Sequence, residues 1–342
     1  MFTLLTLLTL LTLLSMVGCS SKPLDAPPST IEPARAAESP PVSQKPAGAV
    51  LPMAGHPQAA VFDSGTRQLA VLCQPNDPRD PTAPASISVF GDAAASPRVI
   101  GLPGPATALT SDGRGTAYVA ARGGFSVVDL PDGRTTRVAV ADAANTDFTA
   151  IARRADGKLM LGTADGAVYT VTPSDGSVSN RNKIFVRVDA LVTQGDTTVV
   201  LDRGQTSVTT IGADGRAEQA LRAGEGATTL AADPLGRVLV ADTRGGQLLV
   251  YGVDPLILRQ AFPVRQAPYG LAGSRDLAWV SQTASNIVIG YDLTTGIPVE
   301  KVRYPTVQQP NSLAFDEASD TLYVVSGSGA GVQVIEHAAG SR

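Results

Sequence analysis

Thiol, imidazole and charged side chains are scarce in this chain of 342 residues. It has two cysteines, two histidines and one tryptophan, and only 17% of its residues are charged. Two cysteines exclude a framework of several disulfides. No cluster of His, Cys and carboxylate residues has the spacing that a zinc site requires. The folded part must therefore be stabilised by an apolar core, for which a hydrophobic content of 43% is ample.

Basic stretches are also missing. The chain has 27 Lys and Arg against 31 Asp and Glu, which gives a net charge of −4, and no stripe of basic residues is visible. Nucleic acid is therefore excluded as a partner. Most acidic residues are Asp beside Gly, in patterns typical of turns, where the Asp side chain accepts hydrogen bonds from nearby backbone amides.

The amino-terminal segment is unlike the rest of the chain. Residues 3–14 repeat Thr-Leu-Leu, and Ser15-Met16-Val17-Gly18-Cys19-Ser20-Ser21 follows. The apolar stretch is too short for a stable membrane span. The segment resembles a bacterial lipoprotein signal, although Met16 replaces the usual Leu and no Lys or Arg precedes the apolar stretch. An upstream start codon would account for the missing positive charge.

This resemblance implies that residues 1–18 are a signal peptide, cleaved between Gly18 and Cys19. Cys19 would then carry a diacylglyceryl group, become the mature amino terminus and attach the chain to the outer side of the cell membrane. An ordinary secretory signal with an incidental cysteine is the alternative. If Cys19 is lipidated, Cys73 has no partner for an intrachain disulfide.

A proline-rich stretch follows the signal. Residues 20–47 contain seven prolines, and the remainder is mostly Ala, Ser and balanced charge. Such a composition buries too little apolar area to fold and favours extended polyproline II. We therefore predict that residues 19–47 are a lipidated cysteine followed by a disordered tether.

Seven copies of one short pattern fill the remaining residues, 48–342. Each copy has an inner segment of small and apolar residues, a Gly/Asp turn, a second apolar segment, a small-residue loop and a third segment. The second segments are residues 69–72, 117–120, 159–162, 198–201, 238–241, 277–280 and 322–325. A period of roughly 42 residues with several short strands predicts an all-β fold, a seven-bladed β-propeller of four-stranded blades.

The two ends of the propeller region complement each other. The seventh copy ends at Val332–Glu336 without a fourth strand, and Ala49-Val50-Leu51 precedes the first copy without a strand partner. We predict that the amino-terminal strand closes blade seven as its outer strand, because this removes an open seam.

Two motifs carry a family resemblance. Residues 105–120 and Tyr291-Asp292-Leu293-Thr294-Thr295-Gly296 resemble YVTN-type propeller repeats, which form seven-bladed rings in surface and periplasmic proteins. The likeness extends over nearly all of residues 49–336, in degenerate copies. Together with the signal, it makes the chain similar to mycobacterial-type propeller lipoproteins, which implies an extracytoplasmic, lipid-anchored propeller and no particular activity.

The same resemblance implies a ligand face, built from the loops that lead into the inner strands and those between second and third strands. Arg122, Arg203 and Arg244 occupy similar repeat positions, so they should point to one face, where Arg could grip carboxylates or phosphates. The structural alternative is Arg–Asp pairing between adjacent blades, with Asp202 and Asp242 as the partners. The candidate binding face comprises Arg122, Arg203, Arg244, Asp202, Asp242, Asp147 and His56.

Catalytic signals are weak. No Gly-x-Ser-x-Gly nucleophile turn occurs, and His56 and His337, the two histidines, lie far apart in sequence. We therefore expect no catalytic residues, no metal and no cofactor. The favoured function is a membrane-anchored, non-catalytic binding or scaffold module for a protein or an envelope glycan. The alternative is a lactonase- or lyase-like enzyme with a metal or acidic site in the central channel.

Overall fold

The computed structural model describes residues 30–75, 80, 82–91 and 96–340. The chain divides into two units, Met1–Thr30 and Ile31–Arg342, and the second unit contains the propeller. The predicted signal peptide, the cleavage site at Gly18 and Cys19, and residues 19–29 of the predicted tether lie outside the described residues. Among the residues described, no helix is long and apolar enough to cross a membrane.

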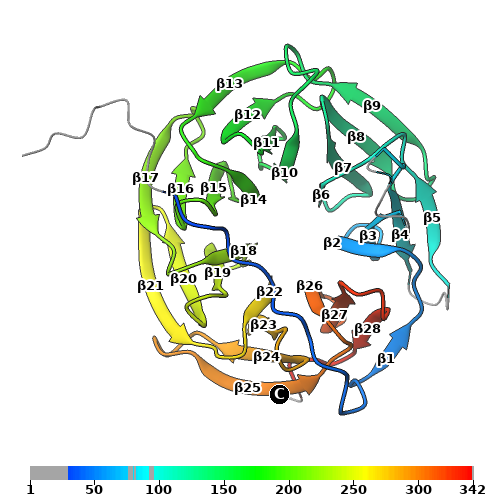
Figure 1. Ribbon diagram of the computed structural model, residues 1–342, viewed down its shortest axis with the longest axis vertical. Coiled ribbons are helices and arrows are strands. Elements are labelled where there is room, and N and C mark those ends of the chain that lie inside the picture. Colours follow the sequence, from blue (N-terminus) through cyan, green and yellow to red (C-terminus); the bar gives the residue numbers. More distant parts are fainter. Residues whose placement is uncertain (1–29, 76–79, 81, 92–95, 341–342) are drawn as a thin grey trace, which may run out of the picture. The chain divides into compact units, whose positions relative to one another are not determined.

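Seven antiparallel sheets of four strands form a ring (Figure 1), so the predicted seven-bladed β-propeller is confirmed. Inner-strand residues of all seven blades line the cavities of a central channel. Blade 1 contains β2 (His56–Asp63), β3 (Gln68–Gln74), β4 (Ser86–Phe90) and β5 (Arg98–Gly101). Blade 2 contains β6 (Ala108–Ser111), β7 (Thr116–Ala121), β8 (Gly124–Asp129) and β9 (Thr135–Ala139). Blade 3 contains β10 (Phe148–Arg153), β11 (Leu159–Thr163), β12 (Ala167–Val171) and β13 (Val178–Lys183). Blade 4 contains β14 (Val188–Gln194), β15 (Thr197–Asp202), β16 (Ser207–Ile211) and β17 (Ala217–Arg222). Blade 5 contains β18 (Ala227–Ala232), β19 (Arg237–Asp242), β20 (Gln247–Val253) and β21 (Leu256–Pro263). Blade 6 contains β22 (Pro268–Gly273), β23 (Ala278–Gln282), β24 (Ile287–Asp292) and β25 (Val299–Pro305). Blade 7 contains β26 (Pro310–Asp316), β27 (Thr321–Ser326), β28 (Val332–Ile335) and β1 (Ala49–Leu51).

Side-chain pattern follows the position of a strand within its blade. The second strands are apolar on both faces because each lies between two neighbouring blades; β11, for example, is buried throughout. The outer strands alternate exposed and partly buried residues, as β13 does, which suits a sheet edge that faces water. The apolar core is thus distributed around the ring, as clusters that each join two adjacent blades.

Closure of the ring occurs as predicted. Strand β1 pairs antiparallel with β28, with Ala49 opposite Val334 and Leu51 opposite Val332. The buried side chain of Gln333 reinforces the joint, since its amide donates to the carbonyl oxygen of Ala47 at 2.8 Å. Both ends of the described propeller therefore belong to one blade.

Residues 31–47 are not a free tether. The predicted disorder is wrong for this stretch, because it lies against the propeller in an irregular, extended conformation with hydrogen bonds to several blades. Figure 1 shows it crossing from β16 past β18 and β22 before it turns into β1. We call residues 31–40 the strap. Composition correctly excluded a core of its own for this segment, but the surface of the propeller supplies the missing partners.

Candidate functional site

An irregularity recurs at the start of the inner strands. In six blades the pairing register with the second strand shifts there, and the bulged residues are Gln58, Thr149, Asp189, Thr228, Tyr269 with Gly270, and Asn311. In blade 2, Thr107 precedes β6 and holds the same place, with its amide bonded to the carbonyl oxygen of Ala120 at 2.9 Å. A β-bulge re-aims a side chain away from the ladder.

These bulged positions form a ring at one end of the central channel. Residues Gln58, Thr107, Thr149, Asp189, Thr228, Tyr269 and Asn311 all line an open cavity of about 520 Å³, which we call the channel mouth. Every blade contributes at least one polar side chain to it. The mouth is therefore a polar opening built by a repeated backbone feature.

Part of the ring is occupied in holding blades together. The hydroxyl of Thr107 donates to the carbonyl oxygen of Phe148 in the next blade at 2.6 Å, and the hydroxyl of Thr149 donates to that of Val188. The amide of Gln58 donates to the carbonyl oxygen of Thr107 at 2.8 Å. These side chains fix the spacing of the inner strands, so ligand contacts must come chiefly from the other side of the mouth.

That other side carries two arginines and a tyrosine. Arg187 donates to Asp189 at 2.6 Å, and Arg203 approaches the same carboxylate at 3.6 Å. Burial raises the pKa of Tyr269; the charge of Arg203 opposes this rise and that of Asp189 adds to it. The phenol is therefore protonated at neutral pH and can donate a hydrogen bond. The two guanidinium groups and the phenol are all hydrogen-bond donors, so they favour a ligand with acceptor oxygens.

The predicted arginines lie on loops at this end of the blades, but they do not form one cluster. Arg122 pairs with Asp147 at 2.9 Å, with both side chains more than half exposed. Arg203 and Arg244 instead donate to backbone carbonyl oxygens of the strap, at Ala34 and Glu32. Pairing between Arg and Asp of neighbouring blades thus occurs, through Asp147.

The expected pairing of these arginines with Asp202 and Asp242 is wrong. Asp202 is fully buried and accepts hydrogen bonds from the amides of Val186 at 2.7 Å and Gly204 at 2.9 Å. Asp242 is equally buried and accepts from the amides of Glu225, Gly226 and Gly245, at 3.0, 2.8 and 3.0 Å. Both carboxylates shape the loops of their own blade, because buried backbone amides need acceptors.

The two histidines lie at opposite ends of the blades. His56 is exposed at the start of β2, on the side of the channel mouth, whereas His337 follows the end of β28 on the other side. They cannot join in one site. Cys73 is buried in the cluster between blades 7 and 1, and burial raises the pKa of its thiol, which disfavours the reactive thiolate.

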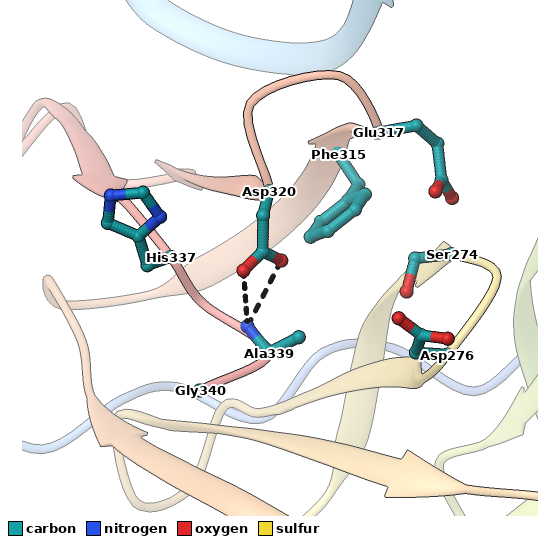
Figure 2. Close-up of a pocket in the computed structure, with 8 residues that line it drawn as sticks. All are labelled: Ser274, Asp276, Phe315, Glu317, Asp320, His337, Ala339 and Gly340. Atoms are coloured by element: carbon teal, nitrogen blue, oxygen red, sulfur yellow. Dashed lines mark hydrogen bonds between the residues drawn. The ribbon is translucent and has the colours of Figure 1, made fainter. Parts of the chain in front are cut away.

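A second cavity, of about 570 Å³, lies at that opposite end between blades 6 and 7 (Figure 2). Asp320 points at the backbone of the carboxy-terminal turn and accepts from the amide of Ala339 at 3.2 Å. Glu317 accepts from the amide of Arg275 at 2.8 Å. Both carboxylates therefore accept hydrogen bonds from backbone amides and have a structural role. Within the part of the chain that the structure describes, no group of three or more His, Cys, Asp or Glu side chains is arranged to hold a metal ion.

Comparison with known proteins identifies the fold class. No family model matches this chain, and no curated protein matches it. A chain in the crystal structure of the mitotic checkpoint complex is similar over 93% of this chain and 99% of its own, with 12% identity and a TM-score of 0.67. The streptogramin B lyase structure is similar over 85% of this chain and 96% of its own, with 11% identity and a TM-score of 0.65. At such low identity the likeness shows a WD40-like β-propeller fold and nothing about activity.

Sequence reasoning missed most of the channel mouth. It placed Arg203 on the candidate binding face, but not Gln58, Arg187 or Asn311. A usable signal was present, because in several copies a polar residue immediately precedes the first small residue of the inner strand, as Thr149 precedes Ala150. Small and apolar residues define the inner strand but do not reveal that this polar position is bulged.

Proposed function

We propose that this chain is a lipid-anchored, extracytoplasmic binding module, in which the propeller holds a protein or a cell-envelope glycan at the channel mouth. The observation that carries the proposal is the ring of bulged polar residues around an opening of about 520 Å³. Convergent polar groups in a concave opening are typical of ligand sites. Arg187 and Tyr269 supply donors suited to the oxygen-rich surface of a glycan or a peptide backbone.

A non-catalytic role agrees with the chemistry of this opening. Among the described residues that line the opening, only Asp189 has a carboxylate side chain. Arg187 and Arg203 both approach this carboxylate. Both arginines engage its oxygens, which indicates that this carboxylate positions cationic side chains at the opening. A lactonase- or lyase-like enzyme remains the alternative, and turnover that depends on a divalent metal would favour it.

Membrane attachment in this proposal rests on the sequence around Gly18 and Cys19. Two acyl chains on the cysteine anchor a protein stably, whereas one chain binds only marginally. The propeller would then stand outside the cytoplasmic membrane, where envelope glycans and exported proteins are its available partners.

The binding site is tested by capture from solubilised envelope with the full chain. An Arg187→Ala/Tyr269→Phe variant removes two donors from the mouth, and Arg216→Ala is the matched control, because its side chain is 85% exposed on a turn at the far end of blade 4. A protein or glycan should be retained by the wild type and the control and lost with the double variant. Equal retention by all three, or none by any, contradicts the proposed site.

The anchor is tested separately with Cys19→Ser in a bacterial host. We expect the wild-type chain in the membrane fraction, labelled by a fatty acid, and the variant without label and outside that fraction. The same distribution for both proteins would contradict lipid anchoring and leave the channel mouth unaffected.

A further inference from the structure

The strap is held at two places on the propeller face, and the first is on blades 4 and 5. The amide of Ile31 donates to the carbonyl oxygen of Gly204 at 2.8 Å, and Arg244 donates to that of Glu32 at 2.7 Å. Two residues after Glu32, the side chain of Ala34 is buried against the propeller and only 7% exposed. Gly226 makes room for it, since a Cβ at position 226 would come within 2.9 Å of the Ala34 side chain.

The second place is on blades 6 and 7, and Ser39 is its centre. This residue is 5% exposed. Its hydroxyl donates to the carbonyl oxygen of Thr283 at 2.5 Å and accepts from the amide of Gln309 at 3.1 Å. Its own amide donates to the side chain of Gln309 at 2.9 Å, and its carbonyl oxygen accepts from Gln308 at 3.2 Å. Every polar atom of Ser39 is therefore bonded to the propeller.

Neighbouring side chains extend this second contact along the strap. Gln309 donates to the carbonyl oxygen of Ala37 at 3.0 Å, and Asn286 donates to that of Pro40 at 2.8 Å. The backbones of Gln309 and Asn286 are in the left-handed region, with φ of 57° and 52°. Such conformations are unfavourable for residues other than glycine and gather at ligand clamps. Here they place two amide side chains against a peptide.

The propeller surface contacts the backbone and the small side chains of the strap, whereas the charged side chains of the strap face solvent. Glu32, Arg35 and Glu38 are exposed, while Ala34 and Ser39 enter the surface. Contacts to main-chain carbonyl oxygens give affinity for any extended peptide, and the two closed positions give selectivity for small residues. The prolines at 33, 40 and 41 favour the extended form before binding, which lowers the entropy lost.

We propose that this surface is a binding groove for an extended, proline-containing peptide with a small residue and, five positions later, a serine. The strap is its intramolecular occupant, and a partner's peptide must displace it. Asn286, Gln309 and Arg244 are not among the residues that line the channel mouth, so this inference goes beyond the proposed function and names a second site with a peptide as its ligand. A segment attached to the same chain has an effective concentration in the millimolar range, so it should weaken binding of an external peptide at least about tenfold.

The test uses a fluorescein-labelled synthetic peptide of residues 30–43 and the detergent-solubilised full chain. An Ala34→Glu/Ser39→Lys variant puts long charged side chains at the two closed positions and should release the strap without altering the groove. Fluorescence anisotropy should show the peptide binding this variant at least about tenfold more tightly than the wild type. Adding Gln309→Ala to the released variant should abolish binding of the peptide. A Ser39→Lys substitution in the peptide should abolish binding as well.

Cleavage by trypsin after Arg35 verifies release independently, since this exposed residue lies between the two places of contact. It should be faster in the released variant. Equal peptide affinity for wild type and released variant, no binding to a released variant that still folds, or binding unaffected by Gln309→Ala would each overturn the groove. None of these outcomes depends on Arg187, Tyr269 or a membrane, so failure here is distinct from failure of the proposed function.

Discussion

At the scale of single residues, Arg154 joins two blades from a buried position. Its side chain is 1% exposed, and it bonds Asp156 at 2.8 Å within its own blade. The same guanidinium donates to the carbonyl oxygen of Ala213 in blade 4 at 3.0 Å. Because the planar guanidinium has several donors in fixed directions, one side chain satisfies acceptors of both blades. A polar contact thus supplements the apolar cluster at this blade interface.

Replacing this arginine should destabilise the propeller. Arg154→Met keeps much of the side-chain volume but leaves buried acceptors without a donor, and we expect a loss of about 1–3 kcal/mol in the free energy of unfolding. Arg154→Lys should lie between this variant and the wild type, because a single ammonium group cannot reproduce the fork. Denaturant titration measures both, with exposed Arg216→Met as the control. Equal midpoints for all four proteins would contradict the bridging role.

At the scale of structural elements, acidic residues at strand ends organise the turns. Asp63 ends β2 and accepts hydrogen bonds from the hydroxyl of Ser111 at 2.5 Å and the amide of Gly115 at 2.9 Å, both in blade 2, and from the amide of Thr66 at 2.9 Å. Burial raises the pKa of Asp63, but these hydrogen bonds outweigh it and hold the pKa below its usual value of 3.8. The folded state therefore favours the carboxylate.

This preference makes the contribution of Asp63 dependent on pH. A pKa lowered by folding stabilises the protein at pH values above the unfolded pKa, and the stabilisation is lost as pH falls through the folded pKa. Asp63→Asn should lower the free energy of unfolding by about 1–3 kcal/mol at pH 7. The difference between variant and wild type should shrink as the pH is lowered through the acid range. Thermal unfolding of both proteins at several pH values measures it, and a constant difference contradicts this account.

At the scale of the whole molecule, the sequence predicts what repeats and misses what is particular to one place. Strand number and blade number follow from a pattern present in every copy, such as residues 117–120 and 159–162. Closure follows from the one copy that lacks its fourth strand and from the unpartnered segment 49–51. The docking of Ser39 onto Gln309 joins positions 270 residues apart and has no repeat to reveal it. Likewise, Asp202 was expected to pair with an arginine of an adjacent blade, whereas its carboxylate faces backbone amides that only the folded loop brings near.

Ring closure depends on one short strand, and its two faces allow a matched test. Leu51 packs into the apolar cluster shared by blades 7 and 1, whereas Val50 is 42% exposed. A charge at position 51 must be buried or must open the joint, so Leu51→Asp should lower the free energy of unfolding by about 2–4 kcal/mol. Val50→Asp introduces the same charge one residue away and should cost less than about 1 kcal/mol.

Circular dichroism during heating measures both variants. Because the blades form one closed ring, the transition temperature of the whole β signal should fall for Leu51→Asp, whereas loss of a single blade would leave most of that signal at the original temperature. Equal transition temperatures for Leu51→Asp and Val50→Asp would show that β1 is not what holds the ring closed.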